Sequence, residues 1–178
     1  MNKKTVQIIV VAIIIVVIGG VVYAKKSGVF NHFSEVETAV TEGKFKYEVD
    51  GDAIPYDELF KDKLPVIAVY GTEGCPACKQ FEPVAMKINK EFEGKAYIKY
   101  VDVWKHQGAT GNIPVRVIPT QVFFDKDGKA FNPTAEEVKR FGLVTYKNND
   151  GKLMYTTHEG ILSYDDMVAI LESMGVKK

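Results

Sequence analysis

Two cysteines lie three positions apart, and the residues on either side of them constrain the local fold. Cys75 and Cys78 are the only cysteines in the chain. The apolar, β-branched run Val66–Tyr70 predicts a buried strand just before them, and a helical pattern begins at Pro76. Proline suits the first helical position, where no N–H donor is needed. The sequence therefore predicts a strand, a tight turn and a helix that begins at the cysteine pair.

This placement favours reactive sulfur chemistry. Unpaired N–H groups and the positive end of the helix dipole stabilise a thiolate over a thiol at a helix N-terminus. We expect Cys75 to be the exposed, attacking thiolate. Cys78, one turn further into the helix, is then the resolving thiol that closes a disulfide. Pro76 and Ala77 separate the two cysteines, so the motif is Cys-Pro-Ala-Cys.

Two other interpretations of the pair are less favourable. A structural zinc site needs four ligands, and the remaining candidates, His32, His106 and His158, include no two at the usual spacing of paired zinc-binding histidines. A static disulfide across so short a loop would stabilise the fold little. We therefore predict a redox-active pair and no metal ligands.

The N-terminal residues predict a membrane segment. Val6–Ala24 is an almost uninterrupted apolar run between two pairs of lysines. Its length suits a bilayer-spanning helix, which pairs its own backbone groups in lipid. The alternative is a signal peptide cleaved after Val22–Ala24, but the apolar run exceeds the usual 7–15-residue core of such peptides. We expect residues 1–26 to form an uncleaved anchor.

Charge and cysteine usage indicate where the rest of the chain lies. More positive charges precede the apolar run (the α-amine, Lys3 and Lys4) than follow it (Lys25 and Lys26). The more positive flank of a membrane segment tends to stay in the cytoplasm. A chain whose only cysteines are a redox pair has no spare thiol to misoxidise in an oxidising compartment. We expect a single-pass protein of the cell membrane with its catalytic domain outside the cytoplasm.

Beyond the anchor, the chain is long enough for one α/β domain. Residues 27–44 predict a linker and a helix capped by Ser34, and residues 45–178 form the expected domain. Runs at 45–49, 66–70, 96–103, 115–124 and 152–157 predict strands, and periodic segments at 55–63, 76–94 and after Ser163 predict helices. Pro83 is expected to kink the second helix.

Basic and acidic residues balance at 23 each without a basic stripe, so nucleic acid is not an expected partner.

Three features together resemble the thioredoxin superfamily over roughly residues 45–174. Cys-Pro-Ala-Cys opens a helix after an apolar strand, and Ile118-Pro119-Thr120 follows at the separation that thioredoxins show between their motif and their cis-proline. His158-Glu159-Gly160, followed by Ser163 and a last helix, is similar to the family's final strand and helix. The resemblance implies a thioredoxin-like fold with a central mixed β-sheet flanked by helices.

The resemblance also implies roles for particular residues. Ile118–Pro119 is expected to be a cis peptide bond beside the motif, with the backbone of Ile118 pairing an extended client segment. The alternative is an ordinary trans proline at a strand start. Cys75 attacks a client disulfide and Cys78 then displaces the client, which leaves a Cys75–Cys78 disulfide. No cofactor is implied.

Two departures from the family concern the surroundings of the motif. Thioredoxins have a buried aspartate that helps to deprotonate the second cysteine, and Val69 stands in its place. Lys99, Asp102 or a water molecule are the alternative proton acceptors. The family's tryptophan before the motif is Gly74 here, so we expect a less bulky rim.

Other residues near the motif have weaker signals. Trp104 and His106 follow the third strand, where they either border the motif or pack within their loop. Residues 130–151 exceed the family's usual hairpin turn. This insertion predicts a short helix capped near Thr134, an extra strand within 141–146 and a turn at Asn148–Gly151. It is either a partner-binding surface or a solvated elaboration.

The resulting hypothesis is a membrane-anchored, extracytoplasmic thiol–disulfide oxidoreductase of a prokaryote. Similar proteins receive electrons from a polytopic membrane carrier and reduce disulfides in client proteins. One alternative is an oxidase or isomerase of exported proteins, although the related oxidases carry a large helical insertion for which this chain has no room. Another is a copper chaperone, for which His158 is the only late ligand candidate.

Overall fold

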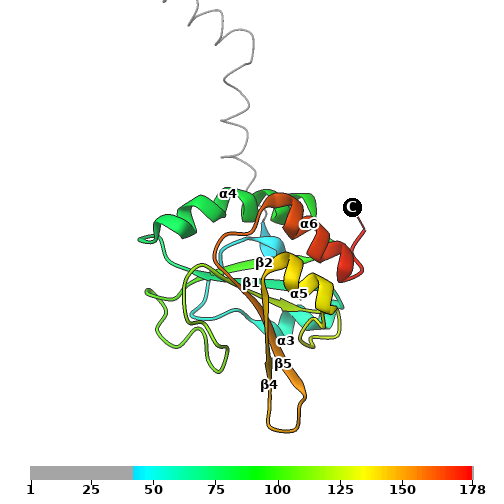
Figure 1. The fold of residues 1–178 in the computed structure, drawn as a ribbon. Helices are drawn as coiled ribbons and strands as arrows, with labels where there is room; N and C mark the ends of the chain where they lie inside the picture. Colours follow the sequence, from blue (N-terminus) through cyan, green and yellow to red (C-terminus); the bar gives the residue numbers. More distant parts are fainter. Residues whose placement is uncertain (1–41, 178) are drawn as a thin grey trace, which may run out of the picture. The chain divides into compact units, whose positions relative to one another are not determined.

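The computed structural model describes residues 42–177, and they form an α/β domain around one sheet. Its five strands run in the order β2-β1-β3-β5-β4 (Figure 1). Their bounds are β1 Val66–Gly71, β2 Tyr97–Asp102, β3 Thr120–Phe124, β4 Leu143–Lys147 and β5 Leu153–Glu159. The pair β1/β2 is parallel and the other three pairs are antiparallel. The expected mixed central sheet is confirmed.

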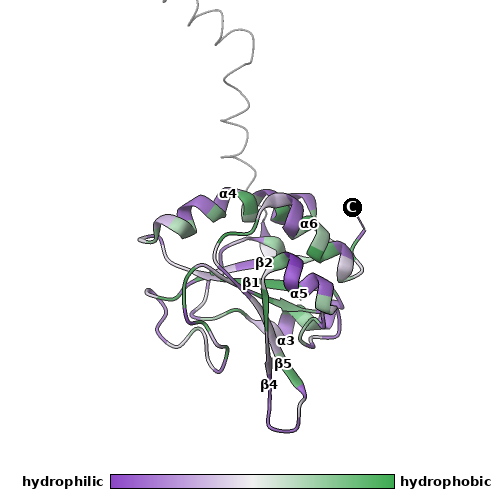
Figure 2. Cartoon of the chain, in the orientation of Figure 1, coloured by the Kyte–Doolittle hydropathy of each residue, from purple (hydrophilic) through white to green (hydrophobic). Residues whose placement is uncertain are grey.

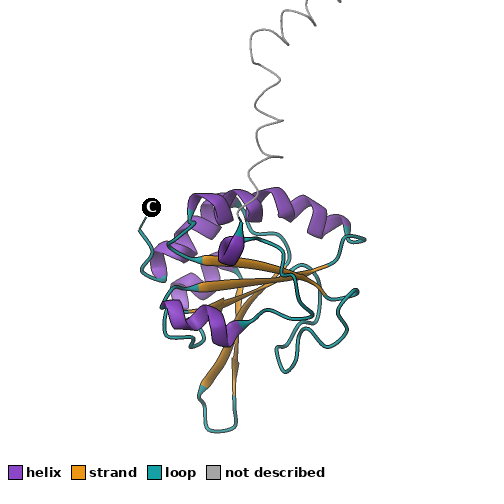
Figure 3. Ribbon diagram, turned by 180° about the vertical axis from the view of Figure 1, so that it is seen from behind, coloured by secondary structure: helices purple, strands orange, loops and turns teal. Residues whose placement is uncertain are grey.

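Helices cover both faces of this sheet. They are α3 Tyr56–Leu59, α4 Pro76–Glu91, α5 Ala135–Phe141 and α6 Tyr164–Ser173, with 3₁₀ turns at Gly43–Phe45 and Phe60–Asp62. Figures 1 and 3 show α4 and α6 side by side on one face, while α3 lies on the opposite face. Strands β1 and β3, whose residues are all buried, are therefore covered on both faces.

Two apolar clusters, one on each face of β1, form the core. Ile67 and Val69 point into the cluster beneath α4 and α6, and Val66, Ala68 and Tyr70 point into the other. All six residues of β1 are buried. Figure 2 shows β1 as a hydrophobic strand, whereas the turn between β4 and β5 is hydrophilic. A strand covered on both faces reads as a continuous apolar run, and this is why the sequence identified β1 so clearly.

Helix α4 has the predicted inward stripe. Phe81, Ala85 and Ile88 are buried within it, and Phe92 follows as its C-cap. The helix continues through Pro83, which lies on its exposed side. The apolar period of 3.6 residues therefore positions the whole helix, and with it the cysteine pair at its N-terminus.

The predicted insertion contains the predicted elements. Thr134 caps α5, since its hydroxyl oxygen accepts a hydrogen bond from the Glu137 N–H. The Glu137 carboxylate accepts one from the Thr134 N–H, which completes a capping box. Strand β4 follows and pairs antiparallel with β5 at the edge of the sheet. Asn148 accepts hydrogen bonds from the N–H groups of Asp150 and Lys152 in the turn that joins the two strands.

Some predicted boundaries are wrong. The expected strand at 45–49 is reduced to a parallel bridge between Glu48 and Tyr100, since Gly43–Phe45 forms a 3₁₀ turn. The run from 115 joins the sheet only at Thr120. The expected helix at 55–63 is a single α-helical turn followed by a 3₁₀ turn, which ends at Lys63 in the left-handed region.

The anchor expected at residues 1–26 and nearly all of the linker and helix expected at 27–44 lie outside the described residues. Within residues 42–177, no helix combines the length and the apolar character that crossing a bilayer requires.

Candidate active site

Cys75 occupies the N-cap of α4. Its Sγ accepts a hydrogen bond from the N–H of Cys78 at 3.3 Å, and Pro76 takes the first helical position, as predicted. The turn before it is closed by a hydrogen bond from the Cys75 N–H to the Thr72 carbonyl at 3.2 Å. The sulfur of Cys75 is thus held where the unpaired donors of the helix converge.

This environment makes Cys75 the more acidic thiol of the two. Burial acts to raise its pKa, but hydrogen bonds from the Cys78 thiol and from the N–H groups of Cys78 and Ala77 outweigh burial and lower the pKa below its ordinary value. Hydrogen bonds directed at a sulfur stabilise its anion. The expected attacking role of Cys75 therefore agrees with its surroundings.

Cys78 has the opposite character. Its side chain is only 7% exposed. Burial raises its pKa to about 11, and the hydrogen bond with Cys75 adds to that effect. At neutral pH the pair thus combines an acidic, accessible thiol with a buried thiol that retains its proton, which suits sequential attack and resolution.

The predicted cis peptide bond between Ile118 and Pro119 is confirmed. The Sγ atom of Cys75 lies 3.7 Å from the carbonyl oxygen of Ile118. The N–H of Gly160 donates to the Pro119 carbonyl at 2.8 Å, so the loop after β5 supports this segment. The structure therefore brings together the motif and the Ile118–Pro119 bond that the sequence placed far apart.

The expectation of a less bulky rim is wrong, because Trp104 lies against Gly74. A Cβ atom at position 74 would lie 3.1 Å from the indole ring. The indole is 68% exposed. An aromatic side chain from the loop after β2 therefore lies against Gly74, the residue at which the family carries its own tryptophan. His106 does not share this position, since its Nδ1 contacts Asp52 Oδ1 at 2.9 Å.

Asp102 holds the loops around the motif and is poorly suited to accept a proton. Its carboxylate accepts hydrogen bonds from the Thr72 hydroxyl and from the N–H groups of Glu73, Trp104 and Lys105. Burial tends to raise its pKa, but these four bonds outweigh burial and lower it. A carboxylate with this many donors is stabilised as the anion.

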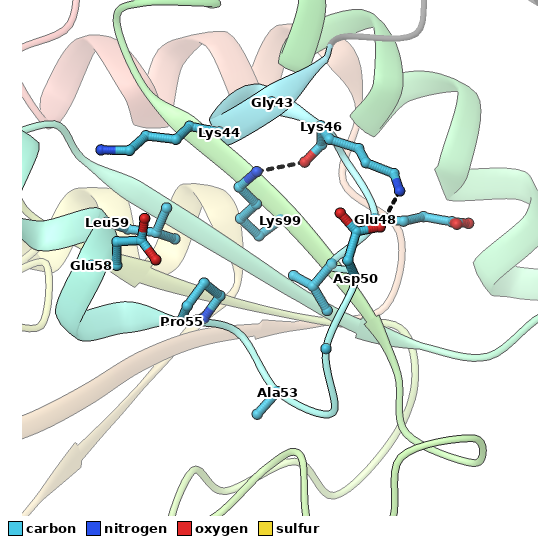
Figure 4. A pocket seen from close by; sticks show the side chains of 12 residues that line it. Gly43, Lys44, Lys46, Glu48, Asp50, Ala53, Pro55, Glu58, Leu59 and Lys99 are labelled. Atoms are coloured by element: carbon cyan, nitrogen blue, oxygen red, sulfur yellow. Dashed lines mark hydrogen bonds and ion pairs between the residues drawn. The ribbon is translucent and has the colours of Figure 1, made fainter.

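Lys99 is wrongly predicted as a proton acceptor for Cys78, because it lies on the other face of β2. Neighbouring strand residues point to opposite faces, and Tyr100 is the residue that faces Cys78. Lys99 lines a separate pocket of about 350 Å³. Figure 4 shows its ammonium donating to the carbonyl of Lys46. Burial lowers its pKa from 10.5 to about 8.

Replacing Lys99 by methionine is expected to stabilise the protein by about 1–3 kcal/mol below pH 8, since the folded state then avoids burying a charge. Between pH 8 and 10.5 the unfolded wild-type chain binds more protons than the folded one, so wild-type stability rises with pH. The advantage of Lys99→Met should therefore shrink across this range and vanish above it. Urea unfolding of the full-length protein measures it, with the exposed Lys95→Met as control; an advantage independent of pH would contradict it.

Sequence reasoning did not place Glu48 and Glu82 beside Cys78. A small pocket beside its thiol is lined by Glu48, Thr72, Glu73, Lys79, Glu82 and Tyr100. Glu82 follows Cys78 by four residues on the same helix, which is the spacing of neighbours on one helix face. That spacing was the available signal. The sequence offered no such signal for Glu48, because only the backbone bridge between Glu48 and Tyr100 brings Glu48 to this pocket.

His158, the residue that the copper hypothesis required, lies within the sheet. Its Nδ1 contacts Gln121 Oε1 at 2.8 Å, and burial lowers its pKa. Among residues 42–177, no three His, Cys, Asp or Glu side chains converge as a metal site would need.

Known proteins share both this fold and this motif region. The profile of the Thioredoxin family matches residues 48–147. The thioredoxin of Pseudomonas aeruginosa is 31% identical over 77 residues, which is 43% of this chain and 70% of that protein. The thioredoxin of Rickettsia bellii is 24% identical over 94 residues, 53% of this chain and 89% of that one. A solved mutant thioredoxin of Halobacterium salinarum superposes with a TM-score of 0.53 at 20% identity, over 78% of this chain and 98% of that one.

The matched region includes the motif strand, the cysteine helix and the cis-proline. With Cys75 and Cys78 at the N-terminus of α4, the chain has the redox pair of a thioredoxin-like protein. The protein belongs to the thioredoxin family.

Proposed function

We propose that this protein is a membrane-anchored thiol–disulfide oxidoreductase that reduces disulfides of client proteins outside the cytoplasm. The observation that carries the proposal is the position of the Cys75 sulfur, which accepts a helix N–H and lies 3.7 Å from the Ile118 carbonyl. Its lowered pKa makes it the nucleophile toward a client disulfide. The membrane location rests on the apolar run Val6–Ala24.

The surface around Cys75 supports a protein client. Three apolar side chains in this region are exposed. Trp104 lies against Gly74, Val117 precedes Ile118 in the chain, and Ile161 follows Gly160. Apolar side chains around a reactive sulfur favour an unfolded or extended segment as the substrate. Electrons would come from a polytopic membrane thiol carrier, which returns Cys75 and Cys78 to the reduced state after each turnover.

The full-length protein in mild detergent should catalyse reduction of insulin disulfides by dithiothreitol. Its reduction potential, followed through the fluorescence of Trp104, the only tryptophan, separates a reductase from an oxidase. We expect a value near that of thioredoxin, roughly −270 mV. A value near roughly −120 mV, as in a strong disulfide oxidant, would instead support the oxidase alternative.

The location and the copper alternative have their own tests. Membranes washed at high salt and high pH should retain the protein at its full length. Protease added to intact spheroplasts or protoplasts should degrade its thioredoxin-like domain. Release of a shortened soluble form would support a cleaved signal peptide. Stoichiometric copper in reduced protein purified without chelator would favour the chaperone hypothesis.

A further inference from the structure

We propose that Glu82 is the proton acceptor for Cys78 when the mixed disulfide with a client is resolved. The inference rests on the proposed redox function and names a group that the motif alone does not supply. Its basis is the small pocket that Cys78 and Glu82 both line.

The resolving step needs a base. The thiol of Cys78 is buried, its pKa is raised to about 11, and at neutral pH it carries its proton. Val69, which stands where the family has a buried aspartate, packs in the apolar core. Since only a thiolate attacks a disulfide, some other group near Cys78 must take the proton.

Geometry selects among the groups that face this thiol. Glu82 lies one helical turn beyond Cys78 on α4, and both line the same pocket. The pocket has a volume of about 20 Å³. This is room for about one water molecule, through which the proton can pass to the carboxylate. The exposed end of Glu82 can then release the proton to solvent.

The neighbouring groups are less suitable. Asp102 is held as the anion by four hydrogen bonds, and the Glu73 carboxylate is engaged in an ion pair with the Lys105 ammonium. The phenols of Tyr47, which is buried, and Tyr100, which is partly buried, have raised pKa values, so they keep their own protons. Lys79 is a cation. Glu82, by contrast, makes no hydrogen bond or ion pair within the described part of the chain.

The surroundings of Glu82 raise the pKa of its carboxyl and so make it a better base. Burial raises the pKa of its carboxyl, the negative charges of Glu48 and Glu73 raise it further, and Lys79 opposes them. A carboxylate with a raised pKa is a stronger base, so its basicity lies closer to that of the thiol. Glu48, across the pocket, thus contributes to the reaction through Glu82.

Cys75 first attacks the client disulfide, forming a Cys75–client bond and releasing one client thiolate. The Cys78 thiol gives its proton to the Glu82 carboxylate, and the Cys78 thiolate attacks the Cys75 sulfur. The Cys75–Cys78 bond forms, the Cys75–client bond breaks and the second client thiolate leaves. The cysteine pair loses two electrons, the client gains them, and Glu82 passes its proton to solvent.

Rapid mixing of the reduced full-length protein with 5,5′-dithiobis(2-nitrobenzoate) tests the proposal. This small disulfide releases one coloured thiolate when Cys75 attacks and a second when Cys78 resolves. Only the first phase depends on reagent concentration, so the two rates are measured separately. In Glu82→Gln we expect an unchanged first phase and a second phase slowed about 10–100-fold at pH 7. Glu82→Asp should recover part of the rate.

The pH profile separates a base from a merely structural residue. The second-phase rate of the wild type should level off once Glu82 is ionised, whereas in Glu82→Gln it should rise steadily toward the pKa of Cys78. Glu93→Gln, which removes a charge from the exposed turn after α4, is the matched control and should behave as wild type. An unchanged second phase in Glu82→Gln, or a larger loss in Glu48→Gln, would overturn the assignment to Glu82. If the wild type itself showed no second phase, the proposed redox function would fail instead.

Discussion

Replacing Cys75 by serine is expected to reduce insulin-disulfide reduction to the uncatalysed rate. The nucleophile of the proposed reaction is the Cys75 thiolate, which accepts the N–H of Cys78 and lies beside the Ile118 carbonyl. A hydroxyl is not ionised near neutral pH and cannot form the mixed disulfide. Neither Cys78, which is buried, nor any other cysteine can replace it, since the chain has only these two.

This loss should occur without unfolding. Cys75 is the N-cap of α4, and serine is among the best N-cap residues. The urea midpoint of Cys75→Ser should therefore stay close to that of the reduced wild type, and the pair of measurements separates chemistry from folding.

Cys78→Ser provides the complementary result. It retains the attacking thiolate but lacks the resolving thiol, so it should accumulate a mixed disulfide between Cys75 and a client peptide, detectable by mass spectrometry. Appreciable insulin reduction by Cys75→Ser, or trapping of the peptide by Cys75→Ser in place of Cys78→Ser, would contradict the assigned roles.

Much of the fold follows from local patterns in the sequence. The apolar run of β1, the periodic stripe of α4 and the cap at Thr134 each predict their element, because burial on both faces, helical spacing and capping chemistry leave distinct signals. The N-cap position of Cys75 and the cis bond before Pro119 were likewise predicted and are confirmed.

Contacts that depend on the arrangement of several elements were not predictable. Residues 98–101 of β2 are largely buried on both faces, so their pattern does not show which face α4 covers, and Lys99 was placed beside the motif in error. The contact between Trp104 and Gly74 depends on a loop that the Asp102 carboxylate holds through backbone donors. Hydrogen bonds of this kind leave no periodic trace in a sequence.

A second large effect is expected on stability rather than on chemistry. Phe123 is fully buried in the middle of the sheet, opposite Ile67 of β1, and belongs to the core cluster beneath α4 and α6. Truncating it to alanine removes its packing and leaves a cavity that a close-packed core fills only partly. We expect Phe123→Ala to lower the free energy of unfolding by about 3–5 kcal/mol.

Urea unfolding of the full-length protein, followed by far-ultraviolet circular dichroism, measures this loss. Met154→Ala, on the neighbouring strand β5 at a side chain that is 41% exposed, is the control and should change the free energy by less than about 0.5 kcal/mol. While it remains folded, Phe123→Ala should keep the lowered pKa of Cys75, because that shift arises from the hydrogen bonds at the start of α4. A loss equal to that of Met154→Ala would contradict the placement of Phe123 at the centre of the core on which α4 rests.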